Sequence, residues 1–369
     1  MIENTVARPP SLPALTGVRF IAAIGVLLYH YGASFLERSG IPHPIAQLLH
    51  NGYLGVSLFF VLSGFILTYT HQTDIINERF IGDFYVARFA RIYPVYFLVL
   101  MIGFPVISAP LSPTSMAAVI LMLQSWTPPQ SGAGYLWVMQ AWTLSVEFFF
   151  YLCFPAILLC AKRLNAIATS LVAAGAAILI VMFGLSSVVP GTTEIPYMSS
   201  TGLPIPVLRT AEFIYGVMLC RLTYFYPRVS KAIGGNIFEF VLTALIVIVM
   251  SFGTDVHIKA LFTVLIGVLI IQLSGGRGAI SAALSSKPFM VLGGASYALY
   301  LLQGPVRAFC EHLVPHPFDR FVSPAITVGG AIAVFRLWEQ PCRKTILSAY
   351  RFIRNRGLPE RVPVRDSVS

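Results

Sequence analysis

Charged residues are scarce in this chain. Asp, Glu, Lys and Arg make up 11% of its 369 residues, whereas hydrophobic residues make up 56%. A soluble domain typically carries about 25% charged residues, and a soluble fold of this composition would expose much apolar surface to water. The shortage of charge therefore argues against a soluble domain and favours a protein whose solvent is the lipid bilayer.

The sequence also lacks patterns that would indicate other classes of protein. Its five cysteines lie in or at the ends of apolar runs and form no CxxC pair, which supports neither a disulfide framework nor a metal site. The first apolar run has no clear cleavage site after it, which argues against a cleavable signal peptide. We find no convincing internal repeat and no low-complexity tract.

Long apolar runs fill most of the sequence. A membrane-spanning helix needs about 20 predominantly apolar residues, and ten such candidates are 14–31, 53–71, 92–110, 142–161, 166–185, 206–223, 237–253, 258–274, 289–310 and 322–345. The apolar stretch 115–126 is too short to cross and leads into a segment rich in Pro and Gly, so we interpret 111–141 as a re-entrant or interfacial element. The sequence predicts an all-α fold, a polytopic transmembrane bundle of about ten helices.

The positive charges favour one orientation of this bundle. The net charge is +10, and the basic residues gather between apolar runs and in the C-terminal tail. Cytoplasmic loops carry an excess of Lys and Arg, which explains this distribution better than nucleic-acid binding. An eleventh span would send Lys162, Arg163 and the tail outside. We therefore expect both termini in the cytoplasm, a membrane domain over 1–345, and a basic tail over 346–369 that contacts anionic lipids.

The first predicted span contains Arg19 and His30. Ionisable residues inside a membrane cost about 2.5–3.5 kcal/mol each on insertion scales, and they usually face the bundle interior or a water-filled cavity. The two positions are eleven residues apart, which puts them on nearly one helix face and about 16 Å apart along the axis. An anion-binding group would then lie at the cytoplasmic end and a titratable imidazole toward the outer half. Helix packing explains this pair equally well when it is taken alone.

Two further segments contain charged candidates. Arg88 and Arg91 lie three residues apart just inside the cytoplasmic boundary, and paired guanidinium groups suit phosphate. Anchoring to lipid headgroups explains this pair equally well. Glu147 is a lone carboxylate in a very aromatic helix, where it needs an Arg, a His or a bound hydroxyl as its partner. A structural ion pair is the competing explanation.

The ninth predicted span contains polar residues along one side. They are candidates for contact with a sugar-like ligand, and packing with satisfied hydroxyl groups is an equally good explanation: Tyr297, Tyr300 and Gln303. The small residues of this span and of 55–65 also allow helices to approach closely.

Taken together, these segments resemble the membrane-bound acyltransferase 3 family, from about Leu15 to Arg343. Each matching piece is weak, whereas six in family-like order are a strong signal. They are Arg19-x10-His30, FFVLSGF at 59–65, Arg88-x2-Arg91-Ile-Tyr-Pro-x-Tyr, Trp-Thr-Leu-Ser-Val-Glu at 142–147, Gly-x-x-Ser-Tyr-x-x-Tyr-Leu at 293–301, and Glu-x-Pro-x-Arg at 339–343. Two features depart from the family. Gln303 stands where members often have His, and the chain shows no counterpart of the soluble periplasmic domain that larger members append.

The resemblance implies a multi-pass O-acyltransferase of the bacterial inner membrane. It implies acetyl-CoA or another acyl-CoA as donor, no metal, and a hydroxyl acceptor on an exopolysaccharide or lipopolysaccharide O-antigen. It also implies that Arg19 and His30 are needed for activity, with Arg88 and Arg91 important. The sugar, the acyl group and the oligomeric state stay open.

We hypothesise that His30 is a general base that takes the proton from a sugar hydroxyl, oriented by Glu147. Arg88, Arg91 and Arg19 would hold the phosphates of coenzyme A. A covalent acyl-His30 intermediate competes with direct transfer. Ser145 has no nucleophile-elbow context, and we expect it to contact substrate instead. The main alternative is a saccharide transporter or flippase, which the lack of paired repeats disfavours, and a non-catalytic scaffold is a second.

Overall fold

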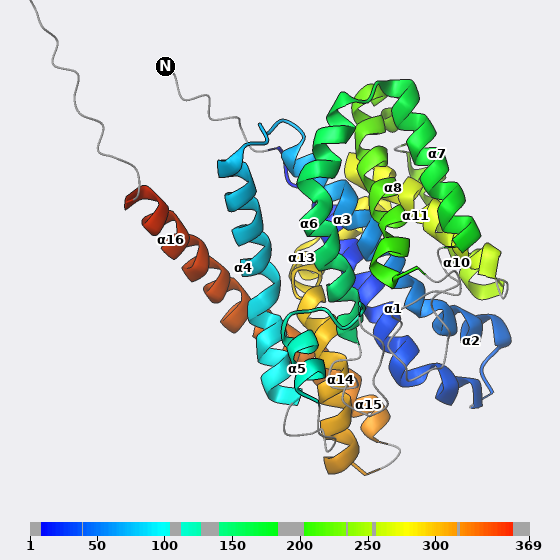
Figure 1. The fold of residues 1–369 in the computed structure, drawn as a ribbon. Helices are drawn as coiled ribbons and strands as arrows, with labels where there is room; N and C mark the ends of the chain where they lie inside the picture. The colour runs from blue at the N-terminus through cyan, green and yellow to red at the C-terminus, as the bar shows by residue number, and fades with distance from the viewer. Residues whose placement is uncertain are drawn as a thin grey trace, which may run out of the picture.

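The computed structural model describes residues 9–38, 40–103, 112–126, 140–183, 203–233, 235–252, 256–315 and 318–356, which form helices and contain no β-strand. Figure 1 shows these helices gathered into one bundle, from which α16 extends beside α4. The first half contains α1 (Pro13–Arg38), α2 (His43–His50), the 3-10 helix η1 (Asn51–Leu54), α3 (Gly55–His71), α4 (Glu78–Gly103), α5 (Pro113–Ile120), α6 (Trp142–Arg163) and α7 (Ala166–Phe183). The second half contains α8 (Ile205–Phe225), α9 (Pro227–Ala232), α10 (Asn236–Phe252), α11 (Val256–Gly275), α12 (Ala279–Leu284), α13 (Lys287–Gly294), α14 (Ser296–Leu313), α15 (Asp319–Val334), the π-helical turn η4 (Phe335–Glu339) and α16 (Gln340–Arg356).

Five helical segments of the described chain are long and apolar enough to cross a membrane. They are Pro13–Tyr31, His43–His71, Glu78–Gly103, Trp142–Arg163 and Phe321–Asn355. A sixth is obtained if α13 and α14, which meet at 56°, are counted as one broken span. The prediction of an all-helical membrane protein is therefore confirmed, whereas the count of about ten spans is not.

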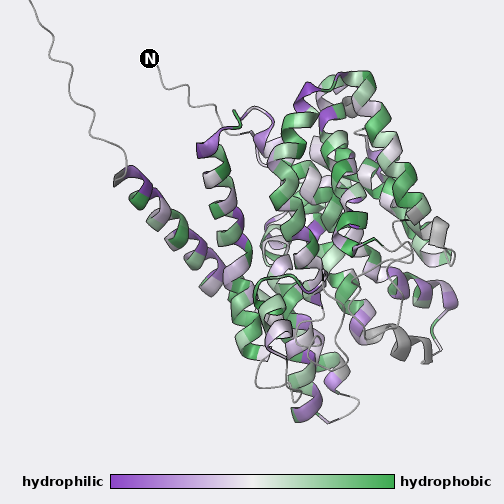
Figure 2. Ribbon diagram, in the orientation of Figure 1, coloured by the Kyte–Doolittle hydropathy of each residue, from purple (hydrophilic) through white to green (hydrophobic). Residues whose placement is uncertain are grey.

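The remaining predicted spans do not pass the same test within the described residues. The apolar parts described for α7, α10 and α11 are Ala166–Met182, Asn236–Phe252 and Ala260–Gly275, and Figure 2 shows α7 as mostly hydrophobic. Within α8, Arg209, Glu212 and Arg221 interrupt the apolar character.

The predicted re-entrant or interfacial segment contains a short helix. The eight residues of α5 are too few to cross a bilayer, and its first turn is capped by Ser112, whose hydroxyl accepts from the Ser115 amide at 3.2 Å. The helix end is fixed to α4, because Tyr96 donates to the carbonyl of Val119 at 2.5 Å. The other parts of 111–141, residues 111 and 127–139, lie outside the described residues.

Small residues bring the helices of the core into close contact, as the sequence predicted. A Cβ atom on Gly216 of α8 would overlap the backbone carbonyl of Val61 in α3, and one on Gly64 would overlap the carbonyl of Phe213. Likewise, a Cβ atom on Gly293 of α13 would overlap the carbonyl of Thr16 in α1. These backbone-to-backbone approaches are typical of membrane helix pairs, and they set α3 and α1 at the centre of the bundle.

The helices are irregular at two places. The chain bends by 56° between α13 and α14, so that Ser296 begins a new helix inside the bundle. The π-helical turn at 335–339 ends in Glu339, whose side chain is only 1% exposed. Broken helices and π-turns occur frequently at functional sites in membrane proteins, and both positions face the site described below.

Candidate active site

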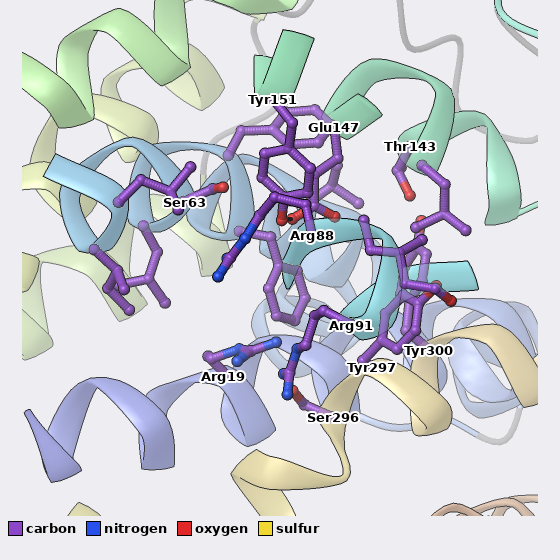
Figure 3. A pocket seen from close by; sticks show the side chains of 18 residues that line it. Arg19, Ser63, Arg88, Arg91, Thr143, Glu147, Tyr151, Ser296, Tyr297 and Tyr300 are labelled. Carbon is purple, nitrogen blue, oxygen red and sulfur yellow. Dashed lines mark hydrogen bonds between the residues drawn. The ribbon is translucent and has the colours of Figure 1, made fainter. Parts of the chain in front are cut away.

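A cavity of about 130 Å³ lies among α1, α3, α4, α6 and α14. Most of its apolar wall comes from α3, so the stretch 56–67, which the sequence favoured as a packing segment, also shapes the cavity. Figure 3 shows polar side chains reaching into it from several helices. They are three arginines (Arg19, Arg88 and Arg91), one carboxylate (Glu147) and six hydroxyl groups (Ser63, Thr143, Tyr151, Ser296, Tyr297 and Tyr300).

The three arginines predicted to bind a donor meet in this cavity. The three-residue spacing of Arg88 and Arg91 places both on the face of α4 that lines it, and Arg19 reaches it from α1 (Figure 3). The guanidinium of Arg88 lies 5.7 Å from the ring centroids of both Phe84 and Tyr151. Arg19 has no hydrogen-bonded or ion-paired partner among the described residues. Its guanidinium is therefore available to a bound group.

Two carboxylates offset part of this positive charge. Arg91 Nη1 lies 2.9 Å from Oε1 of the buried Glu339, so Glu339 pairs with α4 rather than only with Arg343, its neighbour one turn on. Arg343 is close enough to interact electrostatically with Glu339 and both arginines of α4. Four guanidinium groups thus face Glu147 and Glu339, and the cluster carries two more positive than negative charges.

Glu147 has a partner that the sequence did not predict. Its Oε1 accepts a hydrogen bond from the hydroxyl of Tyr151, one turn along α6. No contact between Glu147 and His30 is found among the described residues. The hypothesis that Glu147 orients the imidazole therefore has no geometric basis in this structure, and Glu147 belongs with the arginines. The described residues contain no group of three or more His, Cys, Asp or Glu side chains suited to a metal ion.

The hydroxyl groups from α14 lie on the cavity wall. Tyr297 and Tyr300 both line it, and the Tyr297 hydroxyl donates to the carbonyl of Ile92 at 2.9 Å. Ser296 also lines the cavity (Figure 3), and its buried hydroxyl has no hydrogen-bond partner in the described part of the chain. A buried polar group without a partner is unusual, so the Ser296 hydroxyl is placed to bond a ligand.

His30 and Gln303 lie together, next to the cavity but not on its wall. Nδ1 of His30 is 3.0 Å from Oε1 of Gln303, which follows Tyr300 by one turn of α14. The rings of His30 and Tyr29 are 5.1 Å apart, and Arg307 donates to the backbone carbonyl of His30 at 2.8 Å. The structure thus separates the predicted residues into an arginine cluster and an imidazole–amide pair.

Ser145 is placed apart from both groups. Its side chain is fully buried and its hydroxyl accepts from the backbone amide of Ser125 at 3.3 Å. Ser125 in turn donates to the carbonyl of Trp142 at 2.9 Å. These contacts hold the turn after α5 against α6, so Ser145 has a structural explanation, and it does not line the cavity.

One buried ion pair escaped the sequence analysis. Arg209 and Glu212 on α8 are each 1% exposed, with Nε and Oε2 3.0 Å apart. Arg209 also donates to the Ser57 hydroxyl at 3.1 Å and lies 5.1 Å from the ring centroid of Phe60, a residue of the cavity wall. The rule that singled out Arg19 and Glu147, an ionisable residue within an apolar run, also applies to this pair.

The fold and the cavity define a membrane-embedded helical protein with an arginine-rich internal site. The family described as acyltransferase domain matches residues 12–337, and the chain belongs to that family. The resemblance inferred from the six sequence pieces is therefore confirmed.

Curated relatives are similar at modest identity. The acyltransferase MdmB of Streptomyces mycarofaciens is 29% identical over 229 residues, 56% of this chain and 56% of its own length. The peptidoglycan O-acetyltransferase OatA of Listeria monocytogenes is 25% identical and covers 90% of this chain and 56% of its own length. For the O-acetyltransferase OatA of Staphylococcus aureus the values are 25%, 94% and 59%. The chain thus spans less than two thirds of these relatives, and no solved structure matches it.

Proposed function

We propose that this protein is a membrane O-acyltransferase that moves an acyl group, most simply acetyl, from an acyl-CoA to a carbohydrate hydroxyl. The observation that carries the proposal is the arginine cluster, Arg19, Arg88, Arg91 and Arg343, which is only partly offset by Glu147 and Glu339. Uncompensated charge in an apolar bundle is costly, so a bound anion is expected to complete the site. The diphosphate of coenzyme A has the required charge and suits guanidinium forks.

Other features support the same assignment. The N-terminus of α14 begins at the cavity beside Ser296, and helix N-termini favour negative charge. The names of the relatives, O-acetyltransferases and in one case a peptidoglycan O-acetyltransferase, favour an acetyl donor and a carbohydrate acceptor. We propose Tyr297 and Tyr300 as residues that contact the substrate within the cavity.

The proposed chemistry needs a base beyond the arginine cluster. Arg19 and His30 lie on one face of α1 about 16 Å apart, a separation that the extended pantetheine arm would span. His30 takes the proton of the acceptor hydroxyl, whose oxygen forms a bond to the thioester carbonyl carbon. The carbon–sulfur bond breaks, and the proton passes from His30 to the departing CoA thiolate. Glu147 is assigned to balancing the arginines rather than to orienting His30.

The proposal extends to placement in the membrane. In Figure 1 the N-terminal end of α4 and the junction of α6 with α7 lie at one end of the bundle, and the junction of α14 with α15 lies at the other. The first end carries Arg79, Lys162 and Arg163. Positive-inside loops make it the cytoplasmic end, from which the donor enters. This orientation gives cytoplasmic termini in a bacterial inner membrane, with 1–345 as the membrane domain and 346–369 as the basic tail.

The test is donor binding and turnover by purified protein in nanodiscs without any gradient. Arg88→Ala and Arg91→Ala each lose one charge-assisted contact of about 1.5–3 kcal/mol, which is roughly a 10- to 100-fold weaker Kd for acetyl-CoA. Arg79→Ala is the matched control, because Arg79 lies on the same helix and is exposed. His30→Ala is expected to bind acetyl-CoA but not to transfer its acetyl group to a saccharide, so that no CoA is released. Absence of acyl-CoA binding by wild type would refute the donor and favour a transporter.

A further inference from the structure

The hydrogen bond between His30 and Gln303 has a defined direction. Gln303 presents Oε1 to Nδ1 of His30 at 3.0 Å. An amide oxygen accepts and cannot donate, so the ring nitrogen must carry the proton. Gln303 is 1% exposed, and its backbone carbonyl accepts from the Tyr31 hydroxyl at 2.6 Å, which ties this turn of α14 to α1.

The surroundings favour this orientation of the Gln303 amide over the flipped one. The backbone carbonyl of Val26, one turn back on α1, also faces the His30 ring, and a ring lone pair pointing toward carbonyl oxygens would be repelled. In this orientation the Nε2 donor of Gln303 has no hydrogen-bond partner among the described residues.

We propose that Gln303 is the positioning residue for His30. It holds the imidazole in the tautomer protonated at Nδ1, so that the lone pair lies on Nε2, the atom that takes the proton from the acceptor hydroxyl. The inference rests on the base role of His30 proposed above. In the Ser-His-Asp triad a buried carboxylate orients the imidazole in this way; here a neutral amide does so.

A neutral orienting group fits the charges around the imidazole. Nearby, Arg307 forms an ion pair with Glu311, with Nε and Oε1 2.7 Å apart, and donates a hydrogen bond to the backbone carbonyl of His30. Tyr29 contributes a ring contact, and its own ring lies 5.4 Å from that of Tyr53. No further charged side chain contacts His30 in the described residues. A carboxylate at position 303 would be a buried charge without a described basic partner, which is costly, whereas an amide is not.

The direct test is ¹⁵N NMR of histidine-labelled protein in nanodiscs, which reports which ring nitrogen carries the proton. The chain has seven histidines, so the His30 signals are identified by their loss in His30→Ala. We expect the neutral ring of wild type to be protonated at Nδ1. In Gln303→Leu the two tautomers should mix or exchange places.

Gln272→Leu is the matched control, because Gln272 is a glutamine 2% exposed on α11. It should leave the His30 tautomer unchanged. The inference is overturned if wild-type His30 is protonated at Nε2. It is also overturned if Gln303→Leu keeps the wild-type tautomer while the protein still binds acetyl-CoA, which shows that it is folded.

Kinetics separate this inference from the proposed function. Gln303→Leu should lower kcat about 10- to 100-fold, the range for residues that orient a functional histidine, with an unchanged Kd for acetyl-CoA. Loss of donor binding in Gln303→Leu would contradict a purely positioning role. If wild type shows the Nδ1–H tautomer but no acyl transfer, the proposed function fails while the assigned geometry stands. If wild type transfers and Gln303→Leu transfers equally fast, only the positioning role fails.

Discussion

The buried pair of Arg209 and Glu212 allows a quantitative test of the fold. Both side chains are 1% exposed, 3.0 Å apart at their nearest charged atoms, and carried by α8 at the centre of the bundle. Removing one partner of such a pair leaves a buried charge and costs about 3–5 kcal/mol, whereas replacing both with apolar residues of similar volume is often nearly neutral. We therefore expect Arg209→Leu and Glu212→Leu each to destabilise the protein strongly. The double variant should be more stable than either single variant.

The expected coupling can be measured as a thermal shift in detergent. A loss of 3–5 kcal/mol corresponds to a decrease in Tm of roughly 4–6 °C for a chain of this size. The double variant should recover most of that decrease, although it also loses the contact from Arg209 to Ser57. Additive losses in the double variant would refute the reasoning, because they would show that the two groups act independently. Donor binding by the double variant then reports whether the pair acts on the cavity through Phe60.

Three further predictions follow from particular contacts. Gly216→Ala should cost at least about 1–3 kcal/mol by overpacking, seen as a lower Tm, whereas Gly175→Ala, which has open space around it, should be neutral or stabilising. Ser296→Ala should preserve Tm, because its hydroxyl has no described partner, but should weaken acetyl-CoA binding about 2- to 10-fold; unchanged binding would exclude a donor contact. Arg343→Ala should weaken donor binding in a salt-dependent way, and the exposed neighbour Lys344→Ala should not.

Spacing within a helix was the most reliable information in the sequence. The three-residue spacing predicted that Arg88 and Arg91 share one face of their helix, and that face lines the cavity, as do Tyr297 and Tyr300 of α14. Spacing within a helix could not predict which residues of different helices contact each other. Glu339 forms an ion pair with Arg91, 248 positions away in the chain, and Glu147 accepts a hydrogen bond from Tyr151 on its own helix. No local pattern specifies which helices become neighbours, and this also explains why the partner of His30 was not predicted.

The predicted number of about ten spans was not confirmed, for a related reason. Hydropathy measures how apolar a run is, but it does not locate the bend between α13 and α14. Arg209 and Glu212 lie in a run that the sequence marked as a span, yet their opposite charges at i and i+3 allow them to be buried together. Charge within an apolar run is therefore informative about pairing even where it weakens the prediction of a span.

The separation of the two halves of the site has an electrostatic reason. A base must accept a positive charge, and four guanidinium groups around it would oppose that step, whereas the same groups are needed to hold a diphosphate. About three turns of α1 separate Arg19 from His30, and α14 runs alongside with Ser296 at the arginine end and Gln303 at the imidazole end. The arginine near His30, Arg307, is compensated by Glu311. Under the proposed function, this pair of helices offers a positive site for the donor and a nearly uncharged one for proton transfer, within a single bundle.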